Sequence, residues 1–296
     1  MTTMTLLELI QDKAQQLEQA QVSFGHGTTN AFDEAAWLVL WQLGLPLDTS
    51  LETDSLSSPI VISPEQIAQV QALINKRIST RQPAAYLTKE AWLQGVPFYI
   101  DERSIVPRSL IAEVIADGSI DAWLSDETRR VLDLCTGNGS LAVIAAMAFP
   151  EVSVVGADIS LDALEVAKIN RTKHDFEQRI ELIQSDGLNQ VEGLFDLVLC
   201  NPPYVNSQTM ASLPQEYLAE PTIALAGGSD GMDFIREMLL QLPGKMSENG
   251  ILILEIGNER EYFEAAFPKL WVNWLPTSAG EDQVLLIERD ALLSVE

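Results

Sequence analysis

Short apolar runs and stretches of helical periodicity alternate along the chain from about Arg129 onward. Runs such as "VVGA", "LVLC" and "ILILEI" are continuously apolar, which is typical of strands that are buried on both faces of a sheet. Between them lie helix-length segments such as "SLAVIAAMAF" and "LDALEVAKINRTKH". This alternation favours an α/β fold with a mainly parallel sheet between helices. The predicted strands lie within residues 129–135, 152–159, 179–186, 195–200, 250–257 and 281–288.

The chain before this region has a different texture and predicts a small helical bundle. In "SPEQIAQVQALINKRI", Ser63 is placed to cap a helix and Gln66 to complete a capping box. Apolar residues then recur on one face of that helix, at Ile67, Val70, Ile74 and Ile78. Aromatic and β-branched residues around a Gly-Val-Pro sequence predict a short hairpin within residues 91–109.

Composition narrows the possible functions of the chain. Its 296 residues include 43 acidic and 18 basic ones, for a formal net charge of −25. Such a charge repels nucleic acid and attracts basic partners, although it is equally typical of a merely soluble surface. Two histidines make a His-based triad or a multi-His metal site improbable, so no metal is expected. Two cysteines, the lack of a basic leader and the lack of a membrane-length apolar run favour a cytoplasmic protein with reduced thiols.

A glycine turn follows the first predicted strand in "VLDLCTGNGSLAV". Gly137 and Gly139 allow the backbone to turn sharply and a ligand to approach the start of the next helix. The third glycine of a dinucleotide fingerprint is absent, since Ala142 occupies its position, and no Lys-Ser or Lys-Thr follows as in a P-loop. The turn alone is therefore weak evidence for a nucleotide site.

Three acidic residues strengthen that interpretation because each lies near the end of a predicted strand. Asp133 lies in the first strand and turn, Asp158 ends the second strand, and Asp186 ends the third. Asp158 follows Gly139 by 19 residues, about where an acidic group bonds ribose hydroxyls in doubly wound folds. Each acid alone could be a turn former or a helix cap. Together with the glycine turn, they predict a nucleoside site.

The fourth strand ends in "FDLVLCNPPYVNS", which cannot continue a sheet. Pro202 and Pro203 lack the N–H that a ladder requires, so they stop the strand and stiffen the turn. The Asn201 amide oxygen and the Pro202 carbonyl could accept both protons of a planar NH₂ group, and Tyr204 could supply a flat face for stacking. A proline-rich loop with a structural Asn cap is the alternative.

The pattern resembles the class I S-adenosylmethionine-dependent methyltransferases, whose cofactor carries no phosphate. The resemblance implies that the Asp133 position and the glycine turn hold the methionine part, Asp158 the ribose and Asp186 the adenine amine. The implied cofactor-binding residues are Asp133, Cys135, Thr136, Gly137, Asn138, Gly139, Asp158, Asp186 and Asn201. The implied catalytic residues are Asn201, Pro202, Pro203 and Tyr204.

The stretch from Arg81 to Ser109 is similar to the linker of the HemK-like protein-(glutamine-N5) methyltransferases, and this resemblance spans nearly the whole chain. It implies a helical substrate-recognition domain over 1–88, a hairpin linker over 89–108 and a methyltransferase domain with a seven-stranded sheet over 109–296. Departures from the family pattern occur at Leu93, Leu110 and Asn138.

Two branches of that family differ near Arg108. "VPRS" (residues 106–109) and Glu216–Leu240 resemble the branch that methylates large-subunit ribosomal protein L-three, whereas release-factor methyltransferases usually read "IPRPETE" there. The resemblance therefore implies glutamine methylation of that basic protein. Our hypothesis is that the reaction precedes ribosome assembly. We expect no direct binding to nucleic acid or to a membrane. Release factors, a nucleic acid amino group and a non-catalytic assembly role remain alternatives. Arg108 itself could anchor the hairpin, touch the substrate or form a plain salt bridge.

Overall fold

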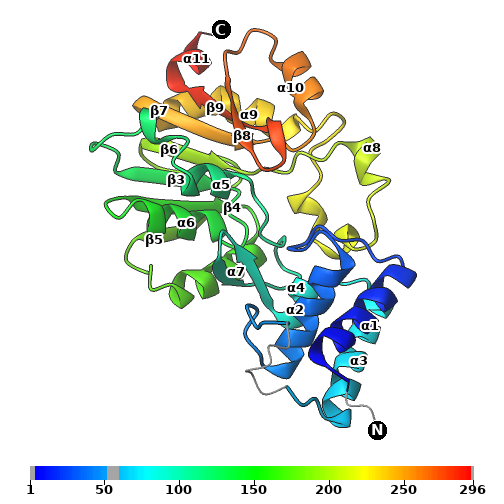
Figure 1. Cartoon of the computed structure of the whole chain (residues 1–296). Coiled ribbons are helices and arrows are strands. Elements are labelled where there is room, and N and C mark those ends of the chain that lie inside the picture. Colours follow the sequence, from blue (N-terminus) through cyan, green and yellow to red (C-terminus); the bar gives the residue numbers. More distant parts are fainter. Residues whose placement is uncertain (1–3, 52–59, 295–296) are drawn as a thin grey trace. The chain divides into compact units, whose positions relative to one another are not determined.

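The computed structural model describes residues 4–51 and 60–294 and divides the chain into two compact units (Figure 1). One unit is Met1–Glu90 together with Pro214–Ala219, and the other is Ala91–Leu213 together with Glu220–Glu296. The segment Pro214–Ala219 is distant in sequence from the rest of the first unit. The domain boundaries predicted from the sequence assigned it to the methyltransferase domain.

The first unit is a helical bundle whose helix ends match the sequence signals. It contains α1 (Leu6–Gln19), α2 (Ala31–Leu43), α3 (Pro64–Thr80), α4 (Ala84–Thr88) and the short 3₁₀ helix η2 (Tyr217–Ala219). Ser63 and Gln66 form the predicted capping box of α3, and Thr5 and Glu8 form another at α1. Gly44 ends α2 in the left-handed conformation, which favours glycine because it lacks a Cβ.

A buried arginine lies at the centre of this helical unit. The Arg77 side chain donates to Glu34 at 2.8 Å, to the Ser23 carbonyl at 2.8 Å and to Glu216 at 3.3 Å. Arg77, Glu34 and Glu216 are all buried. Glu216 belongs to the segment Pro214–Ala219, so this segment completes the charge balance of the helical core.

The second unit contains a seven-stranded sheet with the strand order β5-β4-β3-β6-β7-β9-β8, which confirms the predicted α/β fold. The pairs β5–β4, β4–β3, β3–β6 and β6–β7 are parallel, and β9 is antiparallel to both β7 and β8. The strands are β3 (Arg130–Leu134), β4 (Ser153–Asp158), β5 (Ile180–Gln184), β6 (Phe195–Cys200), β7 (Met246–Glu255), β8 (Asn273–Thr277) and β9 (Gly280–Glu288).

Six of these strands lie where the apolar runs predicted them, but β8 was not located from the sequence. β8 is an edge strand with Pro276 inside it, and only Leu275 is buried. A proline is typical of an edge strand, and a five-residue strand with one buried side chain leaves little hydrophobic signal. The predicted hairpin is present as β1 (Glu90–Leu93) and β2 (Val96–Tyr99), which form a separate two-stranded sheet.

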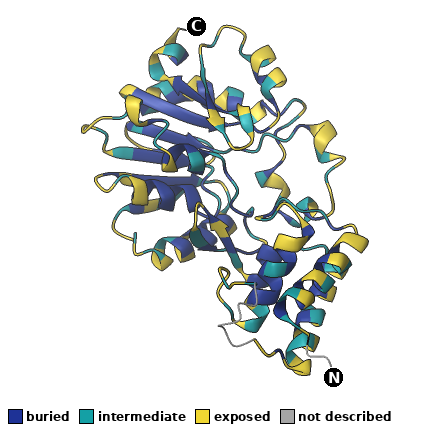
Figure 2. Ribbon diagram, viewed as in Figure 1, coloured by how far each residue is buried: buried dark blue, intermediate teal, exposed yellow. Residues whose placement is uncertain are grey.

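Helices cover both faces of the sheet, as the continuously apolar strands require. α5 and α6 pack on one face, while α9, α10 and α11 pack on the other. Figure 2 shows the strands almost entirely buried between helices whose outer faces are exposed. The helices of this unit are α5 (Ile111–Ala116), α6 (Ser140–Ala148), α7 (Leu161–Lys173), α8 (Ser207–Met210), α9 (Asp233–Gln241), α10 (Arg260–Ala266) and α11 (Arg289–Leu293), with 3₁₀ helices η1 (Asp121–Trp123), η3 (Thr222–Ala224) and η4 (Leu242–Lys245). Within the described ranges, no helix is long and apolar enough to span a bilayer.

Candidate active site

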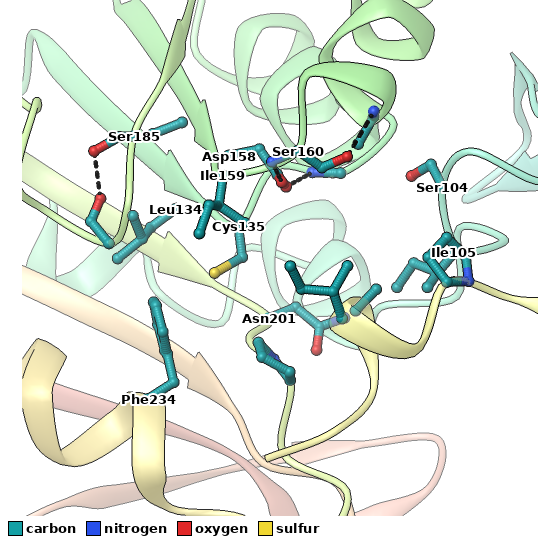
Figure 3. Close-up of a pocket in the computed structure, with 18 of the residues that line it drawn as sticks. Ser104, Ile105, Leu134, Cys135, Asp158, Ile159, Ser160, Ser185, Asn201 and Phe234 are labelled. Atoms are coloured by element: carbon teal, nitrogen blue, oxygen red, sulfur yellow. Dashed lines mark hydrogen bonds between the residues drawn. The ribbon is translucent and has the colours of Figure 1, made fainter. Parts of the chain in front are cut away.

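A cavity of about 550 Å³ lies at the carboxyl ends of β3, β4, β5 and β6, within the second unit (Figure 3). This is the edge of a doubly wound sheet where ligands bind. Part of its lining comes from the residues predicted from the sequence. Those that line it are Cys135, Gly137, Asp158, Asp186, Asn201 and Pro203. Asp133, Thr136, Asn138, Gly139, Pro202 and Tyr204 are not among the lining residues.

The glycine turn forms one wall, and two of its residues depend on having no side chain. Gly137 has a φ of +55°, and a Cβ there would lie 3.2 Å from the Ser104 hydroxyl oxygen. Gly139 has a φ of +78°, and a Cβ there would lie 3.0 Å from Cβ of Ala167 in α7. Both positions therefore need glycine, Gly137 for the turn beside the cavity and Gly139 for close packing of two helices.

Asp158 lies at the end of β4 and accepts backbone hydrogen bonds from two sides. Its carboxylate accepts from Gly137 N and from Ser160 N, both at 2.8 Å. Burial raises the pKa of Asp158, although these N–H groups oppose the rise. Asp158, which was predicted to bind the ribose, therefore also joins the glycine turn to the start of α7.

Asp133 has a different position from the other two acids because it is wholly buried beneath the turn. Its carboxylate accepts from the Thr136 hydroxyl and, at 2.9 Å, from Ala142 N. Burial raises the pKa of Asp133 to about 7, and the nearby charge of Asp158 adds to the rise. In this structure Asp133 holds the glycine turn against α6 from below. Direct contact with a cofactor stays a prediction.

The wall beyond Asp186 contains an aromatic side chain that the motifs did not predict. Phe234, in α9, lines the cavity together with Ser185, Asp186 and Gly187. A Cβ on Gly187 would lie 3.8 Å from the Phe234 ring, so the ring packs beside the Asp186 turn. On the strand-end side, Ile159 also lines the cavity and is half exposed (Figure 3). These two apolar side chains suit a flat aromatic ligand, but neither belongs to a local motif.

The Asn-Pro-Pro-Tyr corner contributes two of its four residues to the cavity. Asn201 and Pro203 line it, and in Figure 3 Asn201 lies between Cys135 and the pair Ser104 and Ile105. The Tyr204 ring packs against Gly257, where a Cβ would lie 2.5 Å from the ring. Tyr204 does not line this cavity, and its role as a stacking face stays a prediction.

Glu255, at the end of β7, anchors that ring and was not predicted from the sequence. The Tyr204 hydroxyl donates to Glu255 at 3.3 Å, and Ser109 Oγ and Leu110 N donate to it at 2.6 and 2.9 Å. Burial raises the pKa of Glu255 and also raises that of Tyr204 well above its usual range. The buried Glu255 carboxylate, at the end of β7, therefore holds the Asn-Pro-Pro-Tyr corner and the start of α5 together.

Residues 103–106 pass beside the glycine turn and form a further wall. Arg103, Ser104 and Ile105 line the cavity. The Asn138 side chain donates to the Ile105 carbonyl at 2.8 Å and accepts from Ser140 N at 2.9 Å. Asn138 therefore ties this segment to the glycine turn, although it does not itself line the cavity.

The two cysteines lie at the base of the site, where adjacent strands β3 and β6 end. Both are free thiols, and Cys200 is buried. The neighbouring Cys200 and burial together raise the pKa of Cys135 well above its usual range, so Cys135 is a protonated thiol rather than a nucleophile. In the described part of the chain, no group of three His, Cys, Asp or Glu residues is arranged to hold a metal ion.

Comparisons with known proteins agree with this geometry. A family model described as the methyltransferase small domain matches residues 120–232. The ribosomal protein uL3 glutamine methyltransferase of Bordetella pertussis is 47% identical over 291 residues, covering 97% of this chain and 96% of that protein. The protein of the same name from Burkholderia pseudomallei is 46% identical over 304 residues, covering 98% and 96%.

Among solved structures, the hMettl16 catalytic domain in complex with the MAT2A 3'UTR hairpin 6 matches with a TM-score of 0.51. It is 11% identical and covers 79% of this chain and 85% of that chain. At this level of identity, the likeness shows a shared fold and nothing about substrate.

Proposed function

The chain belongs to the family of ribosomal protein uL3 glutamine methyltransferases, and we propose that it methylates a glutamine side-chain amide of uL3 with S-adenosylmethionine as the donor. As a member of this family the chain is a methyltransferase. One observation carries the proposal: Asn201 and Pro203 line the same cavity as Gly137, Asp158 and Asp186. An amide-binding corner and a nucleoside-binding edge therefore open into one space.

The residues of this cavity fit S-adenosylmethionine. Gly137 leaves room for a ligand at the turn, Asp158 and Asp186 line the same cavity, and the glycine turn has no phosphate-binding lysine. Carboxylates favour a ligand that carries a positive sulfonium and ammonium group. Phe234 and Ile159 supply apolar walls for a purine. When bound, this group supplies an electrophilic methyl group.

The Asn-Pro-Pro-Tyr corner would activate the substrate amide by binding its hydrogens. An amide nitrogen is a weak nucleophile because its lone pair is delocalised into the carbonyl. The Asn201 side-chain oxygen and the Pro202 carbonyl would accept one N–H each, which raises the electron density on nitrogen and fixes its direction of attack. The nitrogen–carbon bond forms as the carbon–sulfur bond breaks. The displaced proton leaves late for water, since the motif contains no His, Asp or Glu to act as a base.

The charge of the protein supports a basic protein substrate. The net charge of −25 attracts a cationic partner at long range and repels the phosphates of RNA, so we place the reaction before ribosome assembly. This proposal predicts that methyl transfer to isolated uL3 weakens steeply as salt screens the attraction. A rate that does not change with salt would contradict electrostatic capture.

The experiment compares uL3 with release factors. Each purified protein is incubated with the enzyme and methyl-labelled S-adenosylmethionine, and the methylated peptide is mapped by mass spectrometry. We expect one glutamine of uL3 to gain a single methyl group at low salt, and release factors to gain little. Methylation of release factors alone would reject uL3 as the substrate, and label in co-purifying RNA would reject a protein substrate.

A further inference from the structure

Glu220 is a buried carboxylate that holds together two segments distant in sequence. Its Oε1 accepts from Val106 N at 2.9 Å and from Arg108 at 2.7 Å, and its Oε2 accepts from Arg108 at 2.8 Å. The Glu220 side chain is fully buried, while that of Arg108 is 26% exposed. Arg108 and Glu220 therefore form a two-point ion pair, which fixes direction as well as distance. The pair shows the salt bridge that was one of the alternatives for Arg108.

The two segments that this pair joins are two walls of the cavity. Arg103, Ser104 and Ile105 directly precede Val106 and Arg108, and they line the cavity. The 3₁₀ helix η3 (Thr222–Ala224) begins two residues after Glu220 and also lines it. Because the paired residues immediately flank lining residues, a shift of the pair would move both walls.

The second wall is also bonded to the amide-binding corner. Val205, which directly follows Tyr204, donates its N–H to the Leu225 carbonyl at 2.8 Å and accepts from Gly227 N at 2.9 Å. A Cβ on Gly227 would lie 2.7 Å from Cα of Tyr204, so the two backbones are in close contact. The segment that starts at Glu220 therefore continues into a backbone ladder beside the Asn-Pro-Pro-Tyr corner.

We propose that the Arg108–Glu220 pair is a positioning element that sets the separation of the two walls through which the target glutamine reaches Asn201. The inference rests on the proposed function, since it assigns the second wall to the protein substrate. A displacement of about 1 Å at a reacting group can lower a rate by up to ~100-fold, so a pair outside the chemistry can still control transfer. The residues predicted to face the cofactor, Gly137, Asp158 and Asp186, lie on other elements than this pair.

The test is Glu220→Gln, which keeps the size of the side chain and removes its charge. We expect kcat/KM for uL3 to fall about 10- to 100-fold, while the Kd for S-adenosylmethionine stays within about twofold of wild type. Arg108→Lys keeps the charge but loses the two-point contact, so its kcat/KM for uL3 should fall by less than that of Glu220→Gln. Glu264→Gln is the matched control, because Glu264 is half exposed in an ion pair with Arg260 on α10. It should match wild type in both constants.

Hydrogen exchange tests the structural role of the pair directly, even if catalysis is lost for another reason. In the cofactor-bound enzyme, Glu220→Gln should speed exchange of the Val205 and Gly227 amides, while Glu264→Gln should not. The positioning role would be overturned if the loss of kcat/KM in Glu220→Gln were explained entirely by a lower melting temperature. Unchanged exchange at these amides would also overturn it. If the wild-type enzyme does not methylate uL3, the proposed function fails, but the exchange result still decides whether the pair holds the wall.

Discussion

Buried carboxylates occur in both units of the molecule, but their partners differ. In the helical unit, Glu34 and Glu216 both bond the buried guanidinium of Arg77. In the methyltransferase unit, Asp133 and Asp158 bond only N–H and O–H groups, and among the described residues neither takes part in an ion pair. Arg77 therefore compensates two buried carboxylates in the helical unit. In the other unit, Glu220 pairs with Arg108, whereas Asp133 and Asp158 have no cationic partner among the described residues.

The pKa of Glu216 follows this difference, but that of Glu34 does not, because burial raises the pKa of Glu34 despite its pair with Arg77. Burial alone would raise the pKa of Glu216, but hydrogen bonds from Ser23 and Arg77 hold it below its usual value. Burial raises the pKa of Asp158, and backbone N–H groups do not reverse the effect. A buried carboxylate costs free energy unless a positive group compensates it. Arg77 compensates the charge of Glu216, whereas no cation among the described residues compensates Asp158 beside the cavity, which leaves its charge available to a cationic ligand.

Arg77→Met should have the largest effect and acts on the helical unit alone. It leaves Glu34 and Glu216 without their shared cation, which should lower the free energy of unfolding by about 3–5 kcal/mol. Urea denaturation followed by hydrogen exchange of α2 and α3 measures the loss. Arg236→Met is the control, because its pair with Asp230 is partly solvent-exposed and should contribute about 1 kcal/mol. Equal losses in the two variants would remove the distinction between the units.

Asn201→Ala tests the role of the cavity in the methyltransferase unit. It removes one of the two proposed acceptors for the amide hydrogens, so the rate of methyl transfer to uL3 should fall about 100- to 1000-fold. The Kd for S-adenosylmethionine, measured by calorimetry, should change little. Asn258→Ala provides a control, since Asn258 is exposed and bonds only the Gln283 side chain in the described structure. A variant at Asn201 that keeps full activity would refute its assigned role.

Asp158→Asn should weaken binding of S-adenosylmethionine about 10- to 100-fold, because it removes a charged acceptor from the cavity. It should also stabilise the ligand-free protein. The folded-state pKa of Asp158 is raised, so its stabilising contribution is present below the unfolded pKa of about 3.9 and is lost as pH rises through the folded pKa.

The advantage of Asp158→Asn in unfolding free energy should therefore grow as pH rises from about 4 and then level off above the folded pKa. Urea denaturation of both proteins across this range measures it. A variant less stable than wild type at neutral pH would show that Asp158 is compensated within the protein, as Glu216 is.

The predictable part of the site consists of residues whose positions follow from local patterns. The apolar runs placed six strands. Asp158 ends β4, Asp186 lies two residues after β5, and Asn201 directly follows β6. Since parallel strands present their carboxyl ends at one edge, residues at those ends meet without further information. The structure brings these three to one cavity, as this argument requires.

Residues that support the site come from segments with no shared pattern. Glu255 bonds Tyr204 and Ser109, Glu220 bonds Arg108, and Phe234 lies beside the Asp186 turn. Their partners are distant in sequence. The local sequence around an acidic or aromatic residue does not predict which distant residue it will contact. The seventh strand was missed for a related reason, since an edge strand buries too little to show a period.

Burial and backbone geometry act over a few residues, so local patterns were enough to predict the alternation of strands and helices, the glycine turn and the chemistry at the strand ends. The packing of distant segments was needed to show that Pro214–Ala219 completes the helical core, that Tyr204 bonds Glu255, and that Glu220 joins two walls. These outcomes depend on which side chains share a buried space, and a buried charge or hydroxyl takes whatever partner the packed fold brings within hydrogen-bond distance.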